Sequence, residues 1–494
     1  MPIPKEILAV ERPKNTVVVM YGKNKNLFAI RERVGCTYDH GRRIPVNGKT
    51  IGHIIDGKYV PKEAHPVPVS QSPVDLKDWG AAVLCDQLAT TLLKELTAVY
   101  DKNDALKIYC IAILRVCNSG IKDYELKDAY EESFISELYP DVALSKNTVS
   151  RFFNDLGKAY SRICKYMSLR AAAVEKGHHV IVDGTLKSNE STVNSLSDYS
   201  RKARTKGTRD ISILYAYDLE AGEPVCSKCF PGNMLDATAY ESFLKDNSIS
   251  KGIIVGDKGF PSSAAKKQFA LHADLHYMNP LKRDSRYIEQ CALLNYEGQL
   301  PGHETILYKK AKAEEGKWLY SFRDTTQSHK EDYGWLHKAQ KSGEFRNDQY
   351  MEDWLLFGTI ILESDLEMEP LIAYQTYGCR WEIELVMRYY KQTCEFDETR
   401  VHDDYSVIGS EFCNFLSTVI TYRMIGAFEK SGLFYKMTYK KLLHILNRAK
   451  KVRIDGANWE LITMNPSQIE ILQELALLPK PAPKKRGRKP KNKV

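Results

Sequence analysis

The spacing of apolar and polar residues changes twice along the chain. Short apolar runs separated by turn sequences such as Asn47-Gly48 predict a small β-rich module over residues 1–62. Residues 78–177 have the apolar spacing of helices. From residue 178, short apolar runs alternate with helical segments. The pattern predicts a multidomain protein of the α+β or α/β class, in which a mixed sheet is flanked by helices.

Within the helical region, polar residues mark two helix starts. Asp104 is expected to cap a buried helix over 105–117, and Ser145 a long helix from Lys146 to near Gly177. The Lys146-x-x-x-Ser150-Arg151 start after shorter helices would suit a helix-turn-helix that reads DNA. An ordinary amphipathic helix fits the pattern as well, so both interpretations stay open.

The segment after residue 178 begins with three strands. A strand at 178–183 precedes a hairpin formed by 209–217 and 223–230, and helices and strands alternate from there to residue 278. Three early strands followed by a β-α alternation are the order of an RNase H-like core. The predicted division of the chain is a β-rich module at 1–62, a helical DNA-binding region at 78–177, a catalytic core at 178–283 and 367–430, a β-rich insertion at 284–366, a C-terminal helical region at 431–479 and a basic disordered tail at 480–494.

Charge changes this picture at one end of the chain. The sequence has 71 Lys and Arg against 63 Asp and Glu, and residues 480–494 supply eight of the positive charges and no acid. Residues 1–479 therefore balance, and the basic tail points to a polyanion, most simply nucleic acid. No apolar run approaches the ~18 residues that span a bilayer, and the eleven scattered cysteines suit reduced thiols in the cytoplasm.

Two predicted strands end in an acid. Asp183 follows His179-Val-Ile-Val, and Asp257 follows Gly252-Ile-Ile-Val-Gly. If the strands are neighbours, the two carboxylates converge, and their repulsion is relieved by a divalent cation such as Mg²⁺. Taken alone, each could equally be a simple turn acid.

A third acid lies on a predicted helix near 368–393. At ~100° per residue, Tyr377, Arg380, Glu384 and Lys391 fall on one helical face, whereas Glu382 points away. An acid with Arg, Lys and Tyr beside it suits a site that holds a metal and a phosphodiester. The alternative is a solvated face with ion pairs four residues apart.

With these motifs in order, the chain resembles the DDE transposases of bacterial insertion sequences. The likeness is to the insertion-sequence-four type, which has a Tyr-x2-Arg-x3-Glu-x6-Lys signature and a β-rich insertion before the last acid. Tyr377, Arg380, Glu384 and Lys391 match that spacing, Asp183-Gly-Thr resembles the first-acid motif and Asp257-Lys258-Gly-Phe the second, where Lys258 replaces the usual Arg. The resemblance covers roughly residues 178–430.

The resemblance implies an RNase H-like core in which Asp183, Asp257 and Glu384 are catalytic and hold two Mg²⁺ ions, for which Mn²⁺ can substitute. It implies nicking and strand transfer at the ends of a mobile element, a homodimer in the synaptic complex, double-stranded DNA as partner and a cytoplasmic, nucleoid-associated protein. Tyr377, Arg380, Lys391 and Lys258 are then expected to contact DNA. The other hypotheses are an RNase H-like nuclease or resolvase without strand transfer, and a DNA-binding protein that has lost its chemistry.

Three further features are weaker. Arg486-Gly-Arg488 in the tail resembles an AT-hook, although charge alone favours general DNA attraction. His178 and His179 are expected to be structural rather than metal ligands. The resemblance suggests that Trp318 or Trp335 in the insertion could stack on a flipped base, but core positions are expected for both.

Overall fold

The computed structural model describes residues 3–22, 27–39, 42–62, 74–200, 207–257, 262–313, 316–399 and 401–480. The chain divides into two compact units, one formed by Met1–Val74 with Ile454–Ala457 and the other by the remainder. No described helix is both long and apolar enough to cross a membrane.

The first unit is a four-stranded antiparallel sheet in the order β1-β2-β3-β4. Its elements are α1 (Lys5–Leu8), β1 (Thr16–Tyr21), β2 (Leu27–Asp39), β3 (Arg42–Ile55) and β4 (Lys58–Pro61). Its core is small and centres on Val18, Ile30 and Ile54. The strands were predicted here, but β3 runs through Asn47 and Gly48, where the sequence suggested a turn.

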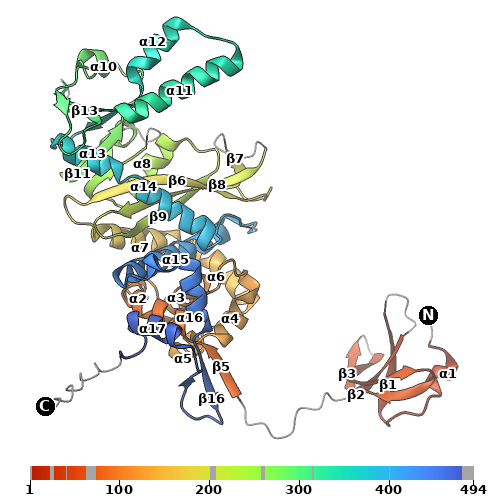
Figure 1. The fold of residues 1–494 in the computed structure, drawn as a ribbon. Coiled ribbons are helices and arrows are strands. Elements are labelled where there is room, and N and C mark those ends of the chain that lie inside the picture. The colour runs from red at the N-terminus through yellow and green to blue at the C-terminus, as the bar shows by residue number, and fades with distance from the viewer. Residues whose placement is uncertain are drawn as a thin grey trace, which may run out of the picture. The chain divides into compact units, whose positions relative to one another are not determined.

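Helices from both ends of the second unit pack together (Figure 1). They are α2 (Gly80–Thr97), α3 (Lys102–Cys117), η1 (Asp123–Glu125), α4 (Leu126–Glu132), α5 (Ile135–Leu138), α6 (Lys146–Lys158), α7 (Tyr160–Ala172), α15 (Asp404–Lys430), η3 (Leu433–Tyr435), α16 (Tyr439–Arg448) and α17 (Pro466–Glu474). The cap of α3 is Asp101, which accepts from the backbone N–H groups of Asn103 and Asp104, so the predicted cap at Asp104 was three residues too late.

Helix α6 begins where the sequence predicts, with Ser145 accepting from the Thr148 amide. It ends at Lys158, and α7 starts directly afterwards, so the single long helix expected to Gly177 is two helices. Two glycines explain how closely α6 approaches α15. A Cβ atom on Gly157 would lie 1.8 Å from the Tyr405 carbonyl oxygen, and one on Gly409 would lie 2.2 Å from that of Phe153. One face of α6 is thereby committed to packing, as in an amphipathic core helix.

The second unit is built on a ten-stranded mixed sheet that runs β12-β13-β14-β15-β11-β10-β6-β8-β7, with β9 also paired to β8. Its first-half strands and helices are β6 (His179–Ser188), β7 (Asp198–Tyr199), β8 (Arg209–Asp218), β9 (Glu223–Pro231), α8 (Asp236–Asp246), β10 (Lys251–Val255), α9 (Ser262–Leu271) and β11 (Asp274–Pro280). Strands β6, β8 and β9 pair antiparallel in sequence, whereas β10 pairs parallel to both β6 and β11. The predicted hairpin and the mixed α/β class are confirmed.

The segment expected to be β-rich, 284–366, extends this sheet but also contains helices. Its elements are α10 (Tyr287–Gln290), β12 (Gly298–Gln299), β13 (Ile306–Lys312), β14 (Trp318–Asp324), α11 (Thr325–Ser342), α12 (Asn347–Leu356) and β15 (Thr359–Ser364). Helix α12 ends only three residues before β15 begins. The C-terminal segment, expected to be helical, likewise adds β16 (Lys450–Ile454) and β17 (Glu460–Leu461), which form a sheet with β5 (Val74–Asp78).

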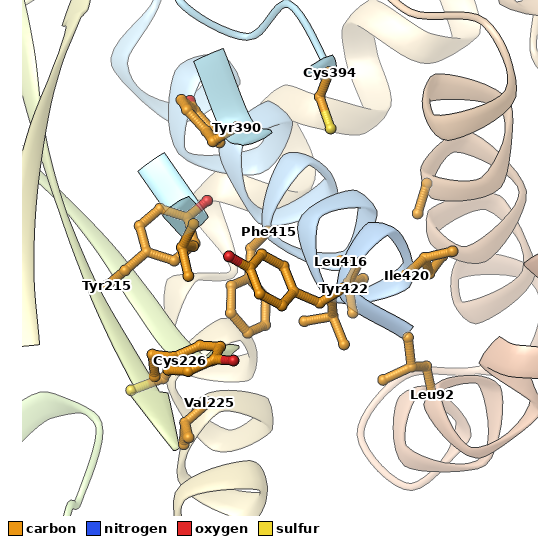
Figure 2. Close-up of a cluster of buried hydrophobic side chains, with 14 of the residues drawn as sticks. Leu92, Tyr215, Val225, Cys226, Tyr390, Cys394, Phe415, Leu416, Ile420 and Tyr422 are labelled. Carbon is orange, nitrogen blue, oxygen red and sulfur yellow. The ribbon is translucent and has the colours of Figure 1, made fainter. Parts of the chain in front are cut away.

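Helix α15 joins the two halves of the second unit because it contacts α2, α3, α6 and strand β9. Most of its residues are buried. Figure 2 shows the cluster where Phe415 and Tyr422 of α15 meet Tyr215 of β8 and Cys226 of β9. A helix that is apolar around most of its surface is the form expected for a central core helix.

One charged pair lies inside this core. The Lys187 ammonium of β6 donates to the Glu411 carboxylate of α15 at 2.5 Å, and the two residues are only 2% and 4% exposed. The other Glu411 oxygen accepts from the Tyr390 hydroxyl at 2.6 Å. The pair therefore ties the sheet to α15 and to the segment before it.

Replacing one partner of this pair should destabilise the second unit strongly. Lys187→Met or Glu411→Leu leaves an uncompensated buried charge, which costs about 3–5 kcal/mol of unfolding free energy. The double variant Lys187→Met/Glu411→Leu removes both charges and should cost less than either single change. Denaturant unfolding of the three variants measures this, and additive losses would contradict a coupled pair.

Candidate active site

The register of two neighbouring strands brings the first two predicted acids together. Parallel strands β6 and β10 pair Ile181 with Val255. Asp183 and Asp257 each lie two residues further on, and side chains two apart point to the same face of a sheet. Asp183 lies within β6, and its Oδ1 accepts from the Gly184 amide at 2.7 Å. Asp257 follows the end of β10.

The third predicted acid comes from a helix that lies over this face. The continuous helix expected over 368–393 is divided into α13 (Pro370–Gly378), α14 (Trp381–Arg388) and a π-helical turn at η2 (Tyr389–Thr393). Helix α14 contacts β6 and carries Glu384, whose side chain is 56% exposed. Arg380 stands at the break between α13 and α14, as the N-cap residue of α14.

Arg380 bridges two of the acids. Its guanidinium lies 3.2 Å from Glu384 Oε1 and 3.8 Å from Asp183 Oδ2. Burial lowers the pKa of Arg380, but Tyr377 and the carboxylates of Asp257, Asp183 and Glu384 outweigh burial and raise it. All four predicted neighbours thus act on one guanidinium, which places them in a single site.

The electrostatic balance of the site is negative. Burial raises the pKa of Asp183, and the charges of Asp257 and Glu384 add to that rise, while the Gly184 amide and Arg380 oppose it. Burial also raises the pKa of the Tyr377 phenol, again against Arg380. Three carboxylates facing one guanidinium leave room for a further cation, and hard carboxylate oxygens suit Mg²⁺.

Two other charged residues of the predicted helix have different neighbours. Burial and the charge of Glu429 raise the pKa of Glu382, and none of the three predicted acids is among the causes. Lys391 acts on Asp210, whose pKa burial raises and Lys391 lowers. Asp210 pairs with Ser188 in the β6–β8 register, five residues beyond Asp183 and so about 16 Å along the strand. Lys391 is therefore separated from the acids along β6, as expected for a residue two turns beyond Glu384.

A pocket of about 310 Å³ that sequence reasoning missed opens beside Glu384 and Arg380. Its remaining wall consists of Phe322, Ile360, Leu362, Tyr374, Tyr377, Gly378 and Trp381. Trp381, 53% exposed, directly follows Arg380 in the sequence, so its position beside the motif was the available signal. No periodicity indicated that the faces of β14 and β15 would complete the wall.

The two tryptophans considered in the insertion lie elsewhere. Trp318 is covered by the ammonium groups of Lys310 and Lys312, at 4.8 and 5.1 Å from the ring centre. Trp335 packs against Phe345 and donates its indole N–H to Asp353. Neither lines the pocket beside Glu384. The predicted DNA contacts Lys258, Arg486 and Arg488 lie outside the described residues.

A second group of side chains that could bind a metal lies near the start of β6. Among the described residues, His178, Asp218 and Glu220 are the one set of three whose ligand atoms all lie within 4.8 Å of one another, so the three predicted acids stand further apart. The side chains of this group already form hydrogen bonds with histidines. His178 Nδ1 is 2.8 Å from Asp218 Oδ2, and His179 Nδ1 is 2.6 Å from Glu220 Oε1. These contacts agree with the structural role expected for both histidines.

Comparison with known proteins gives one family match. Residues 175–407 match the family model of the transposase DDE domain, a segment that includes all three acids and the Tyr377–Lys391 signature. The match supports a transposase of the DDE type. The cryo-EM structure of a piggyBac transposase synaptic complex with hairpin DNA aligns over 75% of this chain and 80% of that chain, with 12% sequence identity and a TM-score of 0.39. That score is too low to establish a shared fold. No curated protein matches the sequence.

The His178–Asp218 contact should make the stability of the second unit depend on pH. The hydrogen bond to Asp218 raises the pKa of His178, although partial burial opposes it, and the charges of Glu220 and Glu175 add to the rise. A raised folded pKa means that the contribution is complete below the unfolded value of ~6.5 and is lost as pH rises through the folded value. His178→Gln should therefore lower Tm more at pH 5.5 than at pH 9. Thermal unfolding at both values tests this, and an equal loss at the two would contradict it.

Proposed function

We propose that this protein is a DDE transposase that binds the ends of its own mobile element and catalyses metal-dependent DNA cleavage and strand transfer. The observation that carries the proposal is the meeting of Asp183, Asp257 and Glu384 around Arg380, inside the segment that matches the transposase DDE domain. The strand order β9-β8-β6-β10-β11, with its parallel β6–β10–β11 part, supports an RNase H-like core.

Asp183, Asp257 and Glu384 would hold the divalent cations, two Mg²⁺ ions with Mn²⁺ as a substitute. The donor set fits, because it consists of hard carboxylate oxygens, and burial followed by the charges of Asp257 and Glu384 raises the pKa of Asp183. Bound cations of this kind activate a water or a 3′-hydroxyl and stabilise the leaving oxygen. Their separation in two-metal sites also suits acids that are not in direct contact with one another.

The chain's own residues would orient the DNA strand. Arg380 offers a planar fork of donors that can pair with two phosphate oxygens at once, which Lys cannot reproduce. A phosphate drawn to Arg380 would compete with Asp183 and Glu384 for the guanidinium and free these acids for metal. Tyr377 would border the same strand, and Lys391, whose charge acts on Asp210, would meet a later phosphate as a point charge.

Partners of this activity would be transposon-end and target duplexes, with a homodimer joining two ends. The proposal extends DNA contacts to Lys258 and to Arg486 and Arg488 of the basic tail. The competing hypothesis is a nuclease on the same core that cuts without joining. Incubating a precut end with target plasmid separates the two, since only a transposase yields the joined product.

Removing any of the three acids should abolish cleavage and leave end binding nearly intact. Metal ligands act on the chemical step, whereas affinity rests on phosphate contacts spread over the surface. Asp183→Ala, Asp257→Ala and Glu384→Ala are compared with Glu382→Ala, whose side chain faces Glu429 instead. A cleavage gel and a binding titration on the same DNA measure both properties. Mg²⁺-dependent cutting by Glu384→Ala would exclude the assigned triad.

Arg380 should matter more for cutting than for binding. Loss of a donor aimed at developing phosphate charge costs about 10²–10³ in rate. We expect this loss for Arg380→Ala, with partial recovery in Arg380→Lys. Lys251→Ala, which removes one exposed charge at the opposite end of β10 from Asp257, is the matched control. If Arg380 only bridged Glu384 at the surface, a pair worth about 0.3–0.5 kcal/mol, both Arg380 variants would cut at the wild-type rate.

A further inference from the structure

Charge is distributed unevenly along the chain. Residues 1–62 contain 12 Lys and Arg against five Asp and Glu, whereas residues 63–479 contain 51 against 58. The apparent neutrality of residues 1–479 therefore combines a basic first unit with an acidic remainder. Excess positive charge in so small a module favours a polyanionic partner.

The first unit carries a two-stranded ribbon that projects beyond its sheet. Strand β1 pairs with β2 only from Leu27 to Glu32, and β4 pairs with β3 only from Gly52 to Ile55. Beyond these limits, Val34–Asp39 lie opposite only Arg42–Val46 among the described residues, and Arg31 and Arg33, at the base of this ribbon, pair with Thr50 and Asn47. At ~3.3 Å per residue, the six residues of the β2 arm extend about 20 Å.

The ribbon exposes apolar and positively charged side chains together, as a binding surface does. Val34 is 69% exposed and Ile44 is 45% exposed, although β-branched side chains on a strand normally pack against a neighbour. Arg31, Arg33 and Arg43 are exposed, and no acid among the described residues forms an ion pair with them. A hairpin without a covering layer is marginally stable in water, so contact with a partner would stabilise it.

Its shape is complementary to a groove of duplex DNA. Strands lie about 4.8 Å apart, so a two-stranded ribbon fits the major groove, which is about 12 Å wide. The register between β2 and β3 shifts three times between Ile30 and Gly35. Such bulges bend a ribbon and increase its right-handed twist, which lets it follow a helical groove. Arginines can then reach phosphates and guanine edges, and the apolar side chains can reach thymine methyl groups.

We propose that the β2–β3 ribbon is a second DNA-binding element, which enters the major groove of duplex DNA at a distance in sequence from the catalytic acids. Its positive charge supplies affinity that the acidic remainder of the chain does not. The choice of DNA as the partner rests on the proposed transposase function. The binding test below requires no cleavage, so the two can fail independently.

The decisive variant is Arg31→Gln/Arg33→Gln/Arg43→Gln in the full-length chain. The matched control, Lys5→Gln/Lys14→Gln/Lys58→Gln, removes three exposed charges from the same unit but outside the ribbon. Binding to a duplex is titrated without divalent metal between 50 and 200 mM salt. Each lost phosphate contact lowers the salt slope by ~0.9, so the ribbon variant should lose up to about 2.7 and bind at least ~10-fold more weakly. The control should change much less.

Two further measurements identify the groove. Methylation of guanine N7 reports on the major groove, and wild-type protein should protect guanines that the ribbon variant leaves reactive. The major groove of double-stranded RNA is too deep and narrow for the ribbon, so the variant should lose less affinity for double-stranded RNA than for duplex DNA of the same length. Val34→Ala/Ile44→Ala, which keeps every charge, should weaken DNA binding without changing the salt slope.

Equal losses in the ribbon variant and its control would mean that only net charge matters and would overturn the proposal. Unchanged guanine reactivity would overturn it as well. Circular dichroism checks that each variant is folded, and Arg31→Lys/Arg33→Lys/Arg43→Lys, which preserves the charge, should keep the wild-type salt slope. If cleavage is never observed but these binding results hold, the transposase proposal fails and the ribbon assignment stands.

Discussion

The buried Lys187–Glu411 ion pair is the contact on which the arrangement of the candidate site depends. Lys187 and Asp183 lie four residues apart on β6 and so face the same side of the sheet. Glu411 accepts from both Lys187 and Tyr390, and Tyr390 belongs to the π turn directly after the helix that carries Glu384. One carboxylate thus fixes the strand of the first acid and the helix of the third. Burying these charges is costly, which makes any other arrangement of the three elements still more unfavourable.

The same face of β6 positions the whole segment formed by α13, α14 and η2. His179 Nε2 lies 3.3 Å from the Thr376 hydroxyl. Further along the strand, Asp183 faces Arg380. At the far end, the Lys187 ammonium lies over the ring of Tyr390. The segment therefore follows β6 from one end to the other. A straight α-helix rises 1.5 Å per residue, less than half the rise of a strand. The break at Cys379 and the π turn at 389–393 are where the segment departs from a regular helix, and π turns are frequent at functional sites.

Local signals predicted the strands and the acids but not the interruptions. Asp183 and Asp257 could be found because each comes at the end of a β-branched run. The parallel register of β6 and β10 then places the two acids side by side. The face containing Tyr377, Arg380 and Glu384 was found from 3.6-residue periodicity, which holds locally across the break. The helix ends at Ala159 and Gly378 carry no proline, so composition gave no sign of them. The helices α11 and α12 and the wall of the pocket beside Glu384 depend on tertiary packing that overrides local propensity.

The net charge of a long stretch of the chain conceals how its charges are distributed. A net charge taken over residues 1–479 is zero, yet the first 62 residues are basic and the remainder is acidic. An acidic unit with three converging carboxylates repels a polyanion until cations neutralise it. Affinity for a polyanion must then come from parts of the chain that lie outside the acids, namely the basic first unit and the basic tail. If the protein acts on DNA as we propose, this separation of affinity from chemistry would allow DNA to be bound before metal enters. It also means that strong binding by itself says nothing about the state of the three acids.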